Sequence, residues 1–529
     1  MTEVYDAIII GSGPAGTSAA FPLLESGHRV LMIDGDVGGS PLFPSAAFSD
    51  ARQTDVDQWR WMLGSKFYAM KAREIASPKF RVPALESVFS DFQAENRIHT
   101  HNFTAVGSLA AGGLSNAWGC GVTQFDQKDL AEFPFPPTAL QASYERVARR
   151  IGISGRSNDD LEQFHGLDQW AQDALPLDRL QVDLLAKYTK NRDKFQRLHI
   201  KMGRSRLAVL SADLATRKGC NLSGNCLWGC SRGALYNSRS EFERLARIPT
   251  FQRIDGIIAG ALSNNVEGWT VDCRDRRTST PVTLRGRKIL LAAGCIASTR
   301  LVLDYLNLVQ QPVRLVSNPT AGFLAWFPRA LGAVQQTGFT GSQLSLSISS
   351  ESGELAAFAA LFPTRGLPTS EFLRYLPISS RYGIDFLKTF LPSCVAGNIF
   401  FPGSLSDHRM VLSDKRELHI TGGFSPDLAL KQKMISRSMA KAIWLLGGII
   451  PPGGCVLGAP GTDVHYVGSL PMRAKPQLGE CHPTGEIEGM RGAFAIDGAS
   501  LPSLPVKSHT LTIMANSDRI AAGISVAAN

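Results

Sequence analysis

Short hydrophobic runs alternate with glycine-rich turns along the chain, and they predict buried strands followed by helices. The apolar run at 7–10 is short and β-branched, as is typical of a strand buried on both faces of a parallel sheet. A helix that Gly27 ends precedes a second strand at 28–33. Further strands are predicted at 288–293 and 493–496. The pattern favours an α/β protein, α+β overall, in which distant segments meet in one sheet.

Other segments predict the remaining elements. Residues 343–361 alternate apolar and polar positions, which indicates two strands and a turn. Helical spacing is found at 296–305, 427–447 and 510–524, the last with Ser508 as its N-cap. We find no internal repeat.

The first strand runs into a glycine motif, G-x-G-x-x-G, within YDAIIIGSGPAG at 5–16. Its first glycine permits a tight turn, the second lets a pyrophosphate approach the backbone, and the third lets the helix pack on the strand. Asp34 ends the second strand, where a carboxylate accepts ribose hydroxyls. FAD and NAD both fit this pattern, and an ordinary βαβ unit is the alternative. The predicted cofactor residues here are Gly11, Gly13, Ala15, Gly16 and Asp34.

Composition indicates a globular enzyme. The chain has 529 residues, of which 44% are hydrophobic and 19% charged, values that exclude a disordered or coiled-coil protein. The length suits three or four domains, or one large two-domain enzyme. The net charge of +9 comes from scattered basic residues without a dense tract, so we expect no nucleic-acid partner.

The nine cysteines are an odd number in a long chain and predict no disulfide framework. The N-terminus begins with acidic residues and enters a strand at once, unlike a signal peptide. No run of 18 apolar residues is present. We therefore expect a cytoplasmic protein.

Four sequence blocks carry a family resemblance. They are GSGPAG at 11–16, GGLSNAWG at 112–119, LLAAGCIASTRLVL at 290–303, and a tail from HYVGSLPM at 465 to HTLTIMANSDRIA at 509. In this order they resemble the glucose–methanol–choline (GMC) family of FAD-dependent oxidoreductases. The blocks cover about a quarter of the chain and span nearly its whole length.

The resemblance implies a pair of active-site histidines, His465 and His509. Such a family removes a hydride from an alcohol carbon to flavin N5, while an imidazole takes the hydroxyl proton. We expect His465 to be the base and His509 to orient the hydroxyl, although the reverse assignment is open.

The resemblance also implies a flavin site. The helix that begins near Thr510 would stabilise negative charge on the reduced flavin through its dipole. No histidine lies between Phe103 and Lys128, where some relatives attach the flavin, so we expect non-covalent FAD. The further cofactor residues predicted are Gly113, Ser115, Asn116, Trp118, Ala293, Gly294, Asp497, Thr510 and Leu511.

Two features depart from the family pattern. Ser469 replaces a threonine and keeps the hydroxyl. The spacing of Cys220, Cys226 and Cys230 is not a standard zinc or iron–sulfur spacing, so we expect a tight buried turn and no metal. Similar cysteine-bearing segments occur in bacterial sugar-oxidising relatives, which favours a sugar or glycoside substrate.

The predicted FAD-binding domain is discontinuous and comprises 1–125, 215–310 and 465–529. Residues 126–214 and 311–464 would form a sheet-based substrate domain. The electron acceptor is left open between oxygen, a quinone and a carrier protein.

Segment 371–404 is rich in Phe, Leu and Tyr, with Arg374, Arg381 and Lys388 between them. It indicates either a buried part of the substrate domain or a dimer face, or a surface for peripheral membrane contact. Membrane contact would favour a sterol-like or lipid-linked alcohol as the substrate. A non-redox flavin lyase or isomerase is a third possibility on the same fold.

Overall fold

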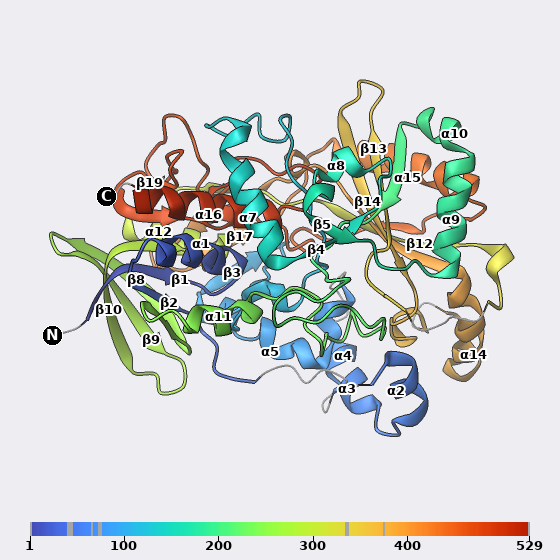
Figure 1. Cartoon of the computed structure of the whole chain (residues 1–529), viewed down its shortest axis with the longest axis horizontal. Helices are drawn as coiled ribbons and strands as arrows, with labels where there is room; N and C mark the ends of the chain where they lie inside the picture. The colour runs from blue at the N-terminus through green and yellow to red at the C-terminus, as the bar shows by residue number, and fades with distance from the viewer. Residues whose placement is uncertain are drawn as a thin grey trace.

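The computed structural model describes residues 3–39, 46–64, 67–71, 77–333, 338–373 and 376–526. Figure 1 shows two large sheets at opposite ends of the long axis, each covered by helices. The N-terminal strand and the C-terminal helix lie at the same end of the molecule, although the whole sequence separates them. The mixed α/β architecture predicted from the sequence is confirmed.

The first sheet has a parallel centre in the order β20-β10-β1-β2-β7. Antiparallel strands extend it, β19 beside β20 and the ribbon β8–β9 beside β10. The four predicted strands are confirmed in this sheet. The strand bounds are β1 (Val4–Ile10), β2 (Val30–Ile33), β7 (Phe251–Ile254), β8 (Ile257–Asn265), β9 (Gly268–Asp275), β10 (Pro281–Leu291), β19 (Glu486–Ile487) and β20 (Met490–Ala495).

Helices cover this sheet and bury its apolar side chains. The first and last long helices, α1 (Pro14–Glu25) and α16 (Thr510–Val526), pack side by side. The central strand β1 is buried, with Ile8 and Ile9 both inaccessible to solvent. Further helices at this end include α7 (Gln141–Ile151), α11 (Phe242–Ala246) and α12 (Cys295–Tyr305).

The second sheet has six strands in the order β18-β12-β15-β14-β13-β6, all antiparallel. One face packs against α9 (Arg179–Lys190) and α15 (Leu428–Leu445). The two strands predicted within 343–361 and the helix predicted within 427–447 are confirmed. The strand bounds are β6 (Ile200–Arg204), β12 (Thr320–Trp326), β13 (Leu344–Ser349), β14 (Leu355–Pro363), β15 (Cys394–Phe400) and β18 (Cys455–Leu457).

A third sheet, in the order β11-β16-β17-β3, lies between the two ends. Its strands are β11 (Val313–Leu315), β16 (His408–Leu412), β17 (Leu418–Thr421) and β3 (Ile98–His101). The parallel pair β17–β3 joins a strand of the predicted substrate domain to one of the predicted FAD-binding domain. The division into two domains therefore stays a prediction.

Short elements complete the described chain. A two-stranded sheet pairs β4 (Ile153–Arg156) with β5 (Ala171–Asp173). The remaining α-helices are α2 (Phe48–Thr54), α3 (Trp59–Leu63), α4 (Tyr68–Lys71), α5 (Glu86–Phe89), α6 (Phe92–Glu95), α8 (Glu162–His165), α10 (Arg192–Gln196), α13 (Ser370–Leu373) and α14 (Ser380–Phe390).

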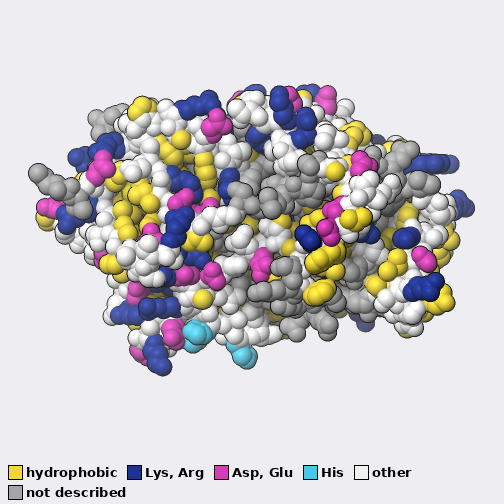
Figure 2. Space-filling view, turned by 90° about the horizontal axis from the view of Figure 1, so that it is seen from below, with side chains coloured by type: hydrophobic (Ala, Val, Ile, Leu, Met, Phe, Trp, Pro, Cys, Tyr) yellow, Lys and Arg dark blue, Asp and Glu magenta, His cyan; other side chains and the backbone are white. Residues whose placement is uncertain are grey.

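The aromatic segment 371–404 divides into two parts. Strand β15 lies inside the second sheet, whereas α14 exposes Tyr382, Ile384 and Phe386. Arg374 lies outside the described residues. In Figure 2 hydrophobic side chains are interspersed with charged ones of both signs over the face shown. Within the described ranges, no helix has the length and apolar character needed to cross a bilayer.

Candidate active site

The N-terminal glycine motif forms a backbone cradle. A Cβ atom on Gly11, whose φ is +113°, would lie 2.2 Å from the carbonyl oxygen of Ala292. On Gly16 it would lie 2.0 Å from the carbonyl oxygen of Gly11. Both glycines are therefore required by close backbone contacts in the turn from β1 into α1. Ala15 lies in the first turn of α1, and its carbonyl accepts a hydrogen bond from Ser517 on α16 at 2.7 Å.

The two glycine-rich segments meet at Gly13 and Gly113. A Cβ atom on Gly113 would lie 3.3 Å from the Cα of Gly13, and one on Gly13 would lie 4.0 Å from the Cα of Gly113. Gly13 is the N-cap of α1, whose first N–H groups and positive dipole end favour an anion. The two backbones are thus bare of side chains beside a helix N-terminus. This arrangement fits a pyrophosphate.

Hydrogen bonds close the loop at 112–118. Asn116 donates to the carbonyl oxygens of Ala111 and Gly113 at 2.9 and 2.7 Å and accepts from Asn237 at 2.7 Å. Ser115 donates to the carbonyl oxygen of Gly112 at 2.5 Å. The polar side chains of this loop hold its own backbone in shape. Trp118 is likewise held, because its Nε1 donates to the carbonyl oxygen of Tyr236 at 2.7 Å.

Asp34 has a partner that the sequence does not reveal. Its carboxylate accepts two hydrogen bonds from Arg253, at 2.8 and 3.0 Å, across the β2–β7 pair. The guanidinium of Arg253 in turn lies over the ring of Phe242 at 4.7 Å. Asp34 is therefore part of an ion pair at the strand end predicted to bind ribose.

Asp497 connects the two C-terminal blocks. Its carboxylate accepts hydrogen bonds from the Gly294 N–H at 2.9 Å and from the Ser298 hydroxyl at 2.5 Å. Ala293 lies beside this turn, between β10 and α12, and its N–H donates to Ser298 at 3.2 Å. Burial raises the pKa of Asp497 to about 6. Its carboxylate shapes the turn, and the predicted contact with the cofactor through its backbone stays a prediction.

His465 and His509 lie together, as the motif positions imply. Their ring centroids are 4.7 Å apart and their planes are inclined by 67°. His509 directly precedes α16, and the Ile513 N–H donates to its carbonyl oxygen at 2.9 Å. The residue that caps this helix is therefore His509, and the prediction of Ser508 was wrong by one position.

The N-terminus of α16 begins beside this histidine pair. Thr510 is partly exposed, whereas the side chain of Leu511 is fully buried in the core. Leu511 can therefore meet a ligand at this helix end through its backbone N–H and not through its side chain.

Asn318 fixes the tautomer of His465. The amide nitrogen of Asn318 donates to the carbonyl oxygens of Phe401 and Pro505 at 2.8 and 2.9 Å. Its Oδ1 therefore accepts, and the atom 3.0 Å away is Nδ1 of His465. Nδ1 thus carries the proton, which leaves the lone pair on Nε2.

Burial keeps both imidazoles neutral. It lowers the pKa of His465 to about 4. Burial, and then the neighbouring His465, lower the pKa of His509 well below its ordinary value. Nδ1 of His509 has no hydrogen-bond partner among the described residues. A neutral imidazole with a free lone pair suits the acceptance of a proton at neutral pH.

Aromatic rings line one side of His465. Phe400 stacks on the His465 ring at 5.3 Å, and Phe358 lies 6.4 Å beyond Phe400. Phe164 of α8 stacks on Phe358 at 5.2 Å. Phe358 and Phe400 are paired residues on neighbouring strands, so the same face of the second sheet carries both. The wall beside the predicted base is therefore apolar.

Lys507 holds the segment that leads to His509. Its ammonium, almost fully buried, forms ion pairs with Asp126 at 2.8 Å and Asp129 at 2.6 Å.

Ser469 anchors the segment that contains His465, because its hydroxyl lies 2.6 Å from that of Thr299 on α12. The serine that replaces the family threonine thus keeps a hydrogen bond.

The three clustered cysteines lie in an irregular segment, with Cys226 in a turn, and are partly buried against the same hydrophobic cluster as Trp118. Cys220, Cys226 and Cys230 are free thiols. In the part of the chain that the structure describes, no group of three or more His, Cys, Asp or Glu side chains is arranged to hold a metal ion.

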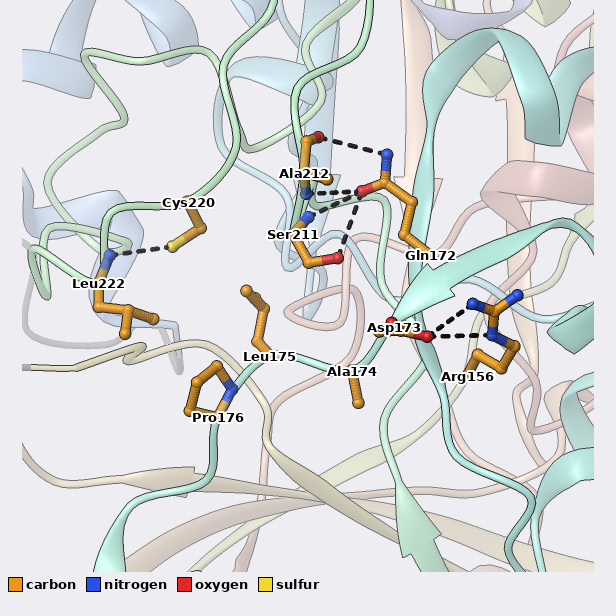
Figure 3. Close-up of a pocket in the computed structure, with 10 residues that line it drawn as sticks. All are labelled: Arg156, Gln172, Asp173, Ala174, Leu175, Pro176, Ser211, Ala212, Cys220 and Leu222. Carbon is orange, nitrogen blue, oxygen red and sulfur yellow. Dashed lines mark hydrogen bonds and ion pairs between the residues drawn. The ribbon is translucent and has the colours of Figure 1, made fainter.

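A cavity of about 570 Å³ lies elsewhere and contains none of the predicted site residues (Figure 3). The polar groups that line this cavity form hydrogen bonds and an ion pair with one another. Gln172 accepts from the backbone of Ser211 and Ala212, and Asp173 pairs with Arg156. We therefore place the candidate site at the histidine pair.

Two solved structures share a similar fold with this chain. The chain aligns over its full length with 99% of formate oxidase from Aspergillus oryzae RIB40, with a TM-score of 0.64 at 12% identity. That structure is a variant studied for its effect on FAD modification. The fold is similar to that of formate oxidase. Pyridoxine 4-oxidase from Mesorbium loti has the same fold, with a TM-score of 0.61 at 12% identity, covering 98% of this chain and 99% of that one.

Sequence comparison adds nothing to this likeness. Neither a protein-family model nor a curated protein matches the chain. The similarity therefore lies in the fold, which brings together the four sequence blocks that carry the resemblance.

Proposed function

We propose that this protein is an FAD-dependent oxidoreductase of the GMC type that oxidises an alcohol CH–OH group. The observation that carries the proposal is the pair His465 and His509, in which His465 presents a neutral Nε2 lone pair. The fold shared with formate oxidase and pyridoxine 4-oxidase supports it.

The residues present fit FAD. Gly13 and Gly113 leave two bare backbones beside the N-terminus of α1, where a pyrophosphate would bind. Asp34 lies at the end of β2, where the ribose would bind, and the N-terminus of α16 would face the flavin ring. FAD supplies the hydride acceptor when it is bound. We propose non-covalent binding, because the glycine-rich loop contains no histidine.

His465 acts as the base in this proposal. Nε2 takes the proton of the substrate hydroxyl, while Asn318 keeps the other ring nitrogen protonated. His509 lies 4.7 Å from His465, ring to ring, and orients the same hydroxyl. Because burial lowers the pKa of both rings, neither is protonated before the reaction at neutral pH.

The substrate class has two candidates. The cysteine-bearing segment favours a sugar or glycoside, which was the expectation from the sequence. The ring row Phe164, Phe358 and Phe400 favours a lipophilic alcohol instead, such as a sterol-like or lipid-linked one, since a sugar needs polar partners. The exposed apolar side chains of α14 would then meet a membrane surface.

Molecular oxygen is the proposed electron acceptor, because both structural neighbours are oxidases. A quinone or a carrier protein would replace it in a dehydrogenase. Oxygen consumption upon addition of a substrate distinguishes these cases.

The test is the visible absorption spectrum of the purified protein under anaerobic conditions. Sugars, glycosides, sterols and simple alcohols are added in turn, and bleaching of the flavin band identifies the substrate class. The variant His465→Ala should stay yellow but lose at least about a hundredfold in reduction rate. His419→Ala, a half-exposed histidine on β17, is the matched control. A yellow protein that no alcohol bleaches would favour a non-redox lyase or isomerase.

A further inference from the structure

A second hydrogen-bonded chain ends at the backbone of His465. The His465 N–H donates to Oδ1 of Asp463 at 2.9 Å, and the hydroxyl of Ser317 donates to Oδ2 at 2.9 Å. Nε2 of His408 lies 3.0 Å from the same hydroxyl. The Gly423 N–H donates to Nδ1 of His408 at 3.1 Å.

These contacts fix the donor and the acceptor of each hydrogen bond in this series. A backbone N–H only donates, so Nδ1 of His408 is the acceptor and Nε2 carries the proton. Nε2 therefore donates to Ser317, whose own hydroxyl proton points to Asp463. His408 is fully buried on β16, and burial lowers its pKa to about 4, consistent with a neutral ring. The hydrogen bonds of this series therefore all point toward Asp463, whose carboxyl accepts the last of them.

The backbone between the two residues is strained. Val464 has a φ of +64°, a conformation that a β-branched residue rarely adopts. Strain of this kind persists only where surrounding contacts impose it, and it is concentrated at functional sites. The hydrogen bond from the His465 backbone N–H to Asp463 spans this residue, which holds the carboxyl against the backbone of the predicted base.

We propose that Asp463 is a positioning residue for His465, and that its negative charge stabilises the protonated imidazole formed when His465 takes the substrate proton. This rests on the proposed role of His465 as base. Ser317 and His408 hold the carboxyl in place, and its hydrogen bond with the His465 N–H fixes the backbone that carries the imidazole.

The titratable groups around Asp463 are few within the described chain. His465 and Tyr466 follow it in the same segment, and His408 faces it across Ser317. Asp407 directly precedes His408 in the chain, and Arg314 lies on the neighbouring strand β11. Burial raises the pKa of Asp463 to about 7, whereas His408 and His465 stay neutral above about 4. Asp463 is thus the group here that changes charge near neutral pH, and activity should increase as it ionises.

The test compares wild-type holoenzyme with Asp463→Asn, which keeps the shape of the side chain. In histidine-labelled ¹⁵N NMR spectra, the His465 ring signals of the wild type should shift as the pH passes about 7, and those of the variant should not. His465→Ala identifies the signal. No substrate is needed, so this result is independent of whether an alcohol reduces the flavin.

The kinetic arm measures anaerobic flavin reduction by the alcohol that bleaches the wild type. Asp463→Asn should lose about tenfold at pH 8 and little at pH 5.5, so its profile becomes flat. Ser317→Ala removes a donor to the carboxylate and should move the wild-type step to higher pH. A uniform loss at every pH, or a His465 shift near pH 7 that persists in Asp463→Asn, would overturn the proposal.

Discussion

Nδ1 of His465 lies 3.0 Å from Oδ1 of Asn318, a residue 147 positions earlier in the chain. Two backbone carbonyls occupy the amide protons of Asn318, so its oxygen is committed to the histidine. Asn318 therefore decides which nitrogen of the predicted base is free, and this leads to the first prediction.

Replacing Asn318 with Ala should lower the rate of flavin reduction by about 10- to 100-fold, because His465 loses its fixed tautomer. The bound FAD should remain, since Asn318 is not among the residues proposed to hold it. Stopped-flow absorbance measures the rate, and the flavin-to-protein absorbance ratio measures the cofactor content. An unchanged rate in a fully loaded variant would show that the tautomer does not matter.

Gly13→Ala should weaken FAD binding and leave the protein fold intact. The added Cβ would lie 4.0 Å from the Cα of Gly113, an ordinary contact, but it would occupy the space proposed for the pyrophosphate. Equilibrium dialysis against FAD measures the affinity, and circular dichroism monitors the fold. Gly523→Ala in α16, with nothing within 4 Å of the new atom, is the control and should bind FAD normally.

Lys507→Ala should lower the free energy of unfolding by about 3 kcal/mol, because it leaves the buried carboxylate of Asp129 without its partner. Urea unfolding measures the change. Lys218→Ala removes an exposed pair with Asp213 and should cost less than about 1 kcal/mol. Equal effects of the two variants would mean that the buried ion pair contributes no special stability.

His165 should make stability depend on pH. Burial and then Arg206 lower its pKa to about 3, so the folded state keeps the ring neutral while the unfolded chain takes up a proton below about 6.5. The unfolded state binds more protons in this window, and stability therefore falls as the pH drops from 6.5 toward 3.

The variant His165→Gln lacks this proton uptake. The free energy of unfolding of the wild type, minus that of the variant, should fall by at most about 1.4 kcal/mol per pH unit below pH 6.5. Urea titrations at pH 7.5, 6 and 5 measure it. Parallel pH dependences of the two proteins would contradict the assignment of a buried neutral ring.

Much of the fold was predictable, because its signals are local. The strand at 7–10, the glycine turn after it and the helix at 296–305 each follow from residues that are neighbours in the chain. The two histidines could also be found from the sequence, since each occupies a recognisable motif. The capping residue was missed by one position, because both Ser508 and His509 precede the helix and only the hydrogen bond from Ile513 distinguishes them.

The partners of these residues were not predictable. Arg253 on Asp34, Asn318 on His465 and the pair Phe358–Phe400 join segments that are far apart in sequence. No periodicity or motif marks any of them, because each is an ordinary residue in its own segment. Asp463 differs from these partners, because it lies only two residues before His465 in the sequence.

The sequence by itself determined the elements and the chemistry-bearing glycines and histidines, because hydrophobic periodicity and turn geometry act over a few residues. Only the tertiary structure decided which nitrogen of His465 is free, what surrounds it and how its neighbours are charged. Those properties depend on burial and on hydrogen bonds between strands of different sheets, and pairing across hundreds of residues creates both.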